Sequence, residues 1–105
     1  MSSNKLSANT QHALRQMFPP EQHAAVVAVL ETRCGLALPL METASPEALE
    51  RIRFAVLKLS SGSLPELERA VSLANTDWRD VLVAAGFANS LLAHVNWFEA
   101  QFRAQ

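Results

Sequence analysis

The chain has 105 residues, of which 50% are hydrophobic and 18% are charged. This length corresponds to one domain, and the large share of apolar residues excludes an intrinsically disordered chain. Nine Lys and Arg stand against ten Asp and Glu, so the formal net charge is −1. The near-balance argues against nonspecific nucleic-acid binding and against a polybasic membrane patch. No apolar run is long enough to cross a bilayer.

The cysteine content and the N-terminal residues bear on the compartment. Cys34 is the only cysteine, so no intramolecular disulfide can form. The chain does not begin with a basic segment followed by a long apolar run, which argues against a secretory signal. We therefore expect a reduced, cytoplasmic protein. Residues 1–105 would form a single helical domain, with residues 1–6 as a frayed N-terminus.

The first two helices are separated by a pair of prolines. A helix over residues 7–17 should end before Pro19, which cannot donate a backbone hydrogen bond and disfavours helical geometry in the residue before it. Pro20 suits the first turn of a second helix, which would end near Gly35. Residues 36–44 have no assignable secondary structure, and their leucines could pack as an extended loop over the core.

The third helix is the best defined by its sequence. Ser45 can cap it, Pro46 fits its first turn, and Gly62 can end it. We expect Glu50 and Arg53 to pair on its solvent side, where such a pair contributes a few tenths of a kcal/mol. The apolar stripe on the opposite side consists of Leu49, Ile52, Ala55, Val56 and Leu59.

Two further helices follow. Ser63 and Glu66 have the spacing of a capping box, in which each side chain caps the backbone of the other residue. Thr76 can cap the next helix and Gly86 can end it. The apolar face of that helix consists of Trp78, Val81, Leu82 and Ala85.

Asn89 and Ser90 can cap a last helix. Its expected inward face consists of Leu91, Val95, Phe98 and Phe102. The sequence as a whole therefore predicts an all-α fold, a compact single-domain bundle of five to six short helices.

We recognise no catalytic constellation in this chain. Cys34 precedes Gly35 at a predicted helix C-terminus, where the helix dipole disfavours a thiolate. The histidines lack the spacing of metal ligands, and the two carboxylate pairs lie in first turns, where the helix dipole already favours them. We therefore expect no catalytic residue, no metal and no cofactor. These groups are His12, His23 and His94, Glu47 with Glu50, and Asp77 with Asp80.

Residues 64–86 could form a helix-turn-helix, a motif that binds DNA. A recognition helix needs several basic or amide side chains on its exposed face. The candidate helix offers Arg79, which is flanked by Asp77 and Asp80, and these carboxylates would repel phosphates. We therefore expect no nucleic-acid partner.

The two tryptophans are candidate contact residues. Trp78 and Trp97 could close the two ends of the core, with the indole N–H left in water. Alternatively, an exposed Trp97 would mark a partner surface or a homodimer interface, because Val95, Phe98 and Phe102 already fill the inward face of the last helix.

Three segments resemble a family of small bacterial helical proteins that has no assigned activity. The likeness covers most of the chain and is most specific in the second and third segments. It implies a bacterial, cytoplasmic helical domain and carries over no catalytic residue. The segments are Met17-Phe18-Pro19-Pro20, residues 49–60, and Thr76-Asp77-Trp78-Arg79-Asp80 continuing to Gly86-Phe87.

These features favour a protein-binding module without enzymatic activity. It could be an immunity or inhibitor protein that neutralises a bacterial toxin, and it could form a homodimer. The alternative is a small helical ligand-binding domain or enzyme that uses a pocket not visible in the sequence, with His94 or the carboxylates of Asp77 and Asp80 as polar groups. The candidate partner contacts are Arg53, Trp78, Arg79, Asp80, Trp97 and Glu99.

Overall fold

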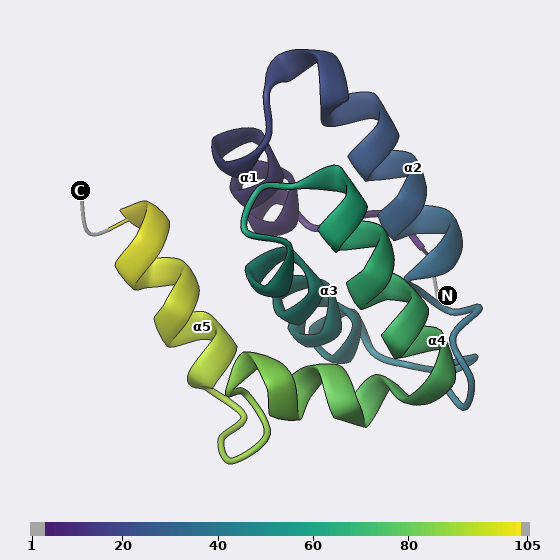
Figure 1. The fold of residues 1–105 in the computed structure, drawn as a ribbon. Coiled ribbons are helices and arrows are strands. Elements are labelled where there is room, and N and C mark those ends of the chain that lie inside the picture. Colours follow the sequence, from purple (N-terminus) through teal and green to yellow (C-terminus); the bar gives the residue numbers. More distant parts are fainter. Residues whose placement is uncertain (1–3, 104–105) are drawn as a thin grey trace.

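The structure, a computed structural model, describes residues 4–103, which form helices joined by turns and loops. An all-α bundle in a single domain is therefore confirmed (Figure 1). No helix within residues 4–103 is long and apolar enough to cross a membrane. The helices are α1 (Ala8–Met17), the 3-10 turn η1 (Pro20–Gln22), α2 (His23–Arg33), α3 (Pro46–Ser60), α4 (Leu64–Ala85), α5 (Ala93–Phe98) and the π-helical turn η2 (Glu99–Arg103).

Helix α3 lies at the centre of the bundle. It contacts α1, α4 and α5, and the other helices surround it (Figure 1). Eight of its 15 residues are buried, which is more than a one-sided apolar stripe requires. Phe54 and Leu57, which lie outside the predicted stripe, are 1% and 0% exposed. A helix covered on several sides buries residues around most of its circumference.

Of the predicted serine caps, Ser45 is confirmed and Ser63 is not. Ser7 and Ser45 cap α1 and α3, and each side chain accepts a hydrogen bond from the backbone N–H three residues later, at 3.1 Å. Ser63 precedes α4 but makes no side-chain capping bond, so the predicted capping box is wrong. The Glu66 side chain pairs with Arg69 one turn later in the same helix.

The two helices expected over residues 64–86 form one element, α4, with a kink at Asp77. This residue is extended, with φ −158° and ψ 106°. Its Oδ1 atom accepts a hydrogen bond from the backbone N–H of Arg79 at 3.0 Å, so Asp77 caps the second half of α4. The predicted cap, Thr76, instead donates its hydroxyl to the carbonyl of Ser72 at 3.2 Å. Gly86 ends the helix as expected, with φ 80°.

Helix α5 is rotated relative to the expected inward face. His94 and Phe98 are 6% and 2% exposed, whereas Leu91 is 75% exposed and Val95 is 36% exposed. The rotation brings two rings against Phe54 in the core. The Phe98 ring stacks on it at 5.2 Å between centroids, and the His94 ring meets it edge-on at 5.7 Å. Aromatic packing therefore sets the buried face of this short helix.

Residues 4–6 are part of the packed structure, so the expectation of fraying is wrong for them. Leu6 is 4% exposed. Asn4 Oδ1 accepts a hydrogen bond from the backbone N–H of Leu36 at 2.7 Å, which ties the N-terminal segment to the long loop. Residues 1–3, to which the same expectation applied, lie outside the described residues.

The loop of residues 36–44 is a chain of tight turns over the core. The N–H groups of Leu38, Met41 and Ala44 each donate to a carbonyl three residues earlier, at 3.0–3.1 Å. Leu38 and Met41 are buried, as expected for a loop whose apolar side chains pack over the core. Leu40 points the other way and is 82% exposed.

Removing the hydroxyl of Ser45 tests the capping assignments. We expect Ser45→Ala to lower the free energy of unfolding by about 1 kcal/mol, because the N–H of residue 48 loses its acceptor. Ser63→Ala is the matched control, and its effect should stay within about 0.5 kcal/mol, because that side chain makes no capping bond. Denaturant unfolding measures both values. Equal losses in the two variants would restore the capping box at Ser63.

Candidate functional site

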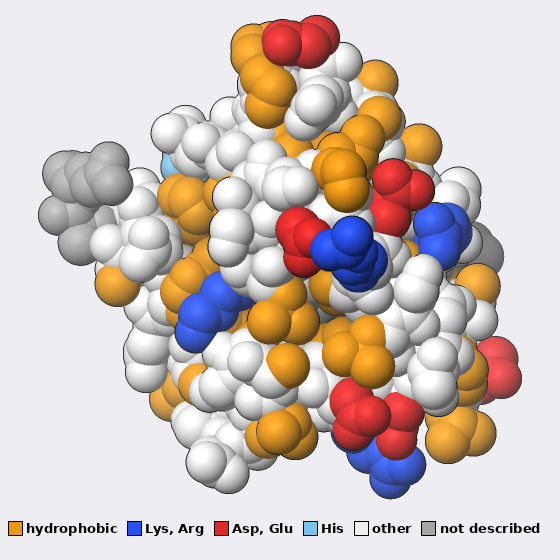
Figure 2. All heavy atoms as spheres, in the orientation of Figure 1, with side chains coloured by type: hydrophobic (Ala, Val, Ile, Leu, Met, Phe, Trp, Pro, Cys, Tyr) orange, Lys and Arg blue, Asp and Glu red, His pale blue; other side chains and the backbone are white. Residues whose placement is uncertain are grey.

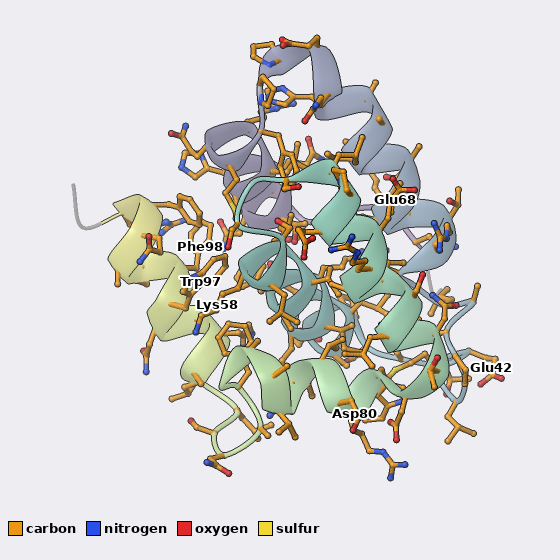
Figure 3. All side chains as sticks on the ribbon, viewed as in Figure 1. Glu42, Lys58, Glu68, Asp80, Trp97 and Phe98 are labelled. Carbon is orange, nitrogen blue, oxygen red and sulfur yellow. The ribbon has the colours of Figure 1, made fainter. Side chains whose placement is uncertain are left out.

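The structure separates the six candidate contact residues into three places. Trp78, Arg79 and Asp80 follow the kink in α4. Trp97 and Glu99 lie on the far side of the molecule, in α5 and η2, and Figure 3 shows Trp97 well apart from Asp80. Arg53 lies inside the bundle. They therefore do not form one surface.

Arg53 is buried, so the prediction that it is a surface contact for a partner is wrong. It is 2% exposed, and its Nε donates to the carbonyl of Cys34 at 2.9 Å. Its other two nitrogens donate to the carbonyls of Lys5 at 3.3 Å and Asn4 at 2.7 Å. Burial lowers the pKa of Arg53 from its ordinary value. The expected surface pair with Glu50 is absent from the ion pairs of residues 4–103, because the guanidinium turns inward to these carbonyls.

Trp97 closes the core at α5. It is half-buried, and its ring lies 5.7 Å from that of Phe54, 6.0 Å from Phe87 and 5.5 Å from Phe102. Figure 3 shows Trp97 and Phe98 on the side of α5 that faces α3. Of the two readings of Trp97, the structure therefore matches the one in which it covers an end of the core.

Trp78 lies beside a depression at the kink. We call this area the kink surface. Trp78 is half-buried and packs against the core, and the tip of the loop of residues 36–44 forms the opposite wall of the depression. The volume of the depression is about 140 Å³. Its lining residues are Pro39, Leu40, Thr76, Asp77, Trp78 and Arg79, and Asp80 follows directly in the chain.

Arg79 is held in one orientation by Asp77. Its Nε and Nη2 atoms donate to Oδ1 and Oδ2 at 3.0 and 3.1 Å, and the same carboxylate caps the backbone N–H of Arg79. The side-chain hydrogen bonds from Arg79, and then the backbone one, hold the pKa of Asp77 below its ordinary value. This exposed pair adds little stability, but its two parallel hydrogen bonds fix the orientation of the guanidinium. Both oxygens of the Asp77 carboxylate are therefore bound to Arg79.

Leu40 is a residue of the kink surface that the sequence did not reveal. Its φ is 65°, in the left-handed region, which costs a residue with a Cβ about 1–2 kcal/mol. The same side chain is 82% exposed, so burial of the leucine does not offset this cost. Strained backbone concentrates at functional sites, and an exposed, strained leucine beside a tryptophan fits that pattern. No sequence signal marks a leucine for positive φ.

The other groups considered in the sequence show no site of their own. Cys34 is buried, and burial raises the pKa of its thiol to about 12. Within residues 4–103, no group of three or more His, Cys, Asp or Glu is gathered as metal ligands would be. Figure 2 shows basic and acidic side chains interspersed over the face in view, with hydrophobic side chains between them.

Comparisons with protein-family models, with curated proteins and with solved structures found no match to this chain. The resemblance to small bacterial helical proteins therefore stays a prediction.

Replacing Arg53 by lysine tests its structural role. We expect Arg53→Lys to lower the free energy of unfolding by about 2–4 kcal/mol, because one ammonium group cannot reach all three carbonyls and leaves buried acceptors unpaired. Arg15→Lys is the matched control on the exposed side of α1 and should change this value by less than about 0.5 kcal/mol. If Arg53→Lys loses no more stability than Arg15→Lys, the Arg53 side chain does not have this structural role and is again a candidate partner contact.

Proposed function

We propose that this protein is a non-enzymatic protein-binding module and that it engages one partner protein through the kink surface. The observation that carries the proposal is Leu40, an exposed and conformationally strained leucine that forms one wall of a depression beside Trp78. Tryptophan and arginine are enriched among residues that dominate binding energy, and Arg79 is already oriented by Asp77. A surface whose side chains are fixed before binding loses less entropy when it binds.

The size of the depression and the charges around it indicate what kind of partner would bind the kink surface. The depression of about 140 Å³ has room for one apolar side chain between Leu40 and Trp78. The charges of Arg79 and Asp77 balance each other, whereas Asp80 in α4 and Glu42 in the adjoining loop are exposed carboxylates. We therefore expect a partner that inserts an apolar anchor and surrounds it with Lys or Arg.

An immunity or inhibitor protein is the role that fits this proposal best. Such a protein needs no catalytic group, and it acts by covering a functional surface of its partner. A basic toxin domain would be complementary to the acidic edge of the kink surface, where Figure 3 places Glu42 and Asp80. Identification of the captured partner tests whether it is a toxin.

Leu40→Gly separates binding from stability. We expect it to weaken binding to the partner at least tenfold, because the depression loses the apolar wall that contacts the partner's anchor. We expect the free energy of unfolding to stay the same or rise by up to about 1 kcal/mol, because glycine adopts positive φ without strain. The partner is first captured with the tagged protein from its native cells, and titration with the purified partner then measures the affinity.

Leu91→Ser is the matched control, because Leu91 is also strongly exposed but lies near the start of α5. It should bind the partner with unchanged affinity. Arg79→Lys keeps the charge and loses the fork to Asp77, and we expect an intermediate loss of affinity. If Leu40→Gly and Arg79→Lys both retain full affinity, the kink surface does not bind this partner.

A further inference from the structure

A second and larger pocket lies between the start of α3 and the start of α5. Its volume is about 280 Å³, compared with about 140 Å³ for the depression at the kink. Figure 1 shows α5 and the loop of residues 36–44 at opposite sides of the bundle, so the two sites are separate. The pocket is lined by Ser45, Glu47, Ala48, Arg51, Leu91 and His94.

Two lining side chains have buried nitrogens without a hydrogen-bond partner. They are Nδ1 of His94 and Nε of Arg51, and no other buried side-chain nitrogen or oxygen of the described residues lacks a partner. The Nη2 atom of Arg51 donates to the carbonyl of Phe87 at 2.6 Å, which holds the guanidinium in place. Buried polar groups nearly always have a partner, so two exceptions among the residues that line one pocket distinguish this pocket from the rest of the described surface.

The charges around the pocket favour an uncharged occupant. Glu47 is negative and Arg51 is positive, so the lining residues carry no net charge. Burial lowers the pKa of His94, against an opposing effect of Glu50 and with a smaller lowering effect of Arg51, and so favours the neutral ring. An anion would meet the carboxylate of Glu47, and a cation would meet the guanidinium of Arg51.

The rest of the pocket and its rim are mainly apolar. Ala48 contributes to the wall, and Leu91 is 75% exposed at the rim. The neighbouring Leu92 and Val95 are 62% and 36% exposed, so apolar side chains cluster in the segment that begins α5. Small-molecule pockets combine a mainly apolar wall with a few convergent polar groups, and this pocket has both.

We propose that this pocket binds a small, uncharged molecule that has an apolar body and a hydrogen-bond acceptor, such as an amide carbonyl. The acceptor takes an N–H of the Arg51 guanidinium, and the apolar body lies against Ala48 and Leu91. This site is independent of the kink surface, so either proposal stands if the other fails.

Three probes of one shape and different charge test the site. Benzamide is uncharged, benzoate is an anion and benzylamine is a cation at pH 7. We expect benzamide to bind with a dissociation constant on the order of a few mM, which is typical of so small a ligand. Benzoate and benzylamine should bind at least fivefold more weakly. Titrations followed by NMR report the shifts of the His94 ring and of the Arg51 Nε–H.

Variants locate the binding. Ala48→Leu fills the pocket and should weaken benzamide binding at least fivefold, and Leu91→Ser removes the apolar rim and should weaken it about threefold or more. Leu40→Gly, at the kink surface, is the control and should leave it unchanged. The proposal is overturned by the absence of saturable shifts at His94 and Arg51 with benzamide, or by equal affinity for all three probes. Unchanged binding in both pocket variants would also overturn it.

Discussion

The buried guanidinium of Arg53 is the interaction on which the arrangement of this bundle depends. From the central helix α3 it holds the carbonyls of Asn4, Lys5 and Cys34, and so joins the N-terminal segment and the end of α2 to the core. Burying a cation is costly, and hydrogen bonds to three carbonyls offset that cost. Gly35 makes this possible, because a Cβ there would lie 2.9 Å from the guanidinium and 2.5 Å from Asn4 Oδ1.

The anchor at Arg53 also fixes where the kink surface lies. The loop of residues 36–44 starts beside the guanidinium, and its first N–H is held by the Asn4 side chain. Leu38 and Met41 are buried, so the loop presents Leu40 to solvent from a fixed base. The other wall comes from α4, whose extended residue, Asp77, turns the helix and caps its second half. The surface therefore needs the long-range anchor and the local cap together.

Most of the fold is readable from the sequence because helix boundaries are local. Ser7, Ser45 and Gly86 act within one turn of their own positions, and the structure places each where its residue type predicts. The local sequence pattern predicts that Arg53 lies on the surface. Its side chain is buried instead, because it donates hydrogen bonds to carbonyls about 20 and 50 positions away along the chain. The orientation of α5 is likewise set by rings in other elements.

The candidate site is less readable than the fold for the same reason. Trp78 and Arg79 are recognisable as contact residues by type. The role of Leu40 depends on its positive φ, which the residue type does not predict. The orphaned nitrogens of Arg51 and His94 are visible only once α3 and α5 are packed together. Sequence patterns thus indicate candidate residues, and the packing decides which of them face outward and share a surface.

The most direct test of the kink surface is photo-crosslinking in native cells. A photoreactive amino acid is placed at position 40 in one variant and at position 21, an exposed site between α1 and α2, in another. We expect one protein adduct of defined mass from position 40 and none from position 21. No adduct at position 40, or the same adduct from both positions, would contradict the account.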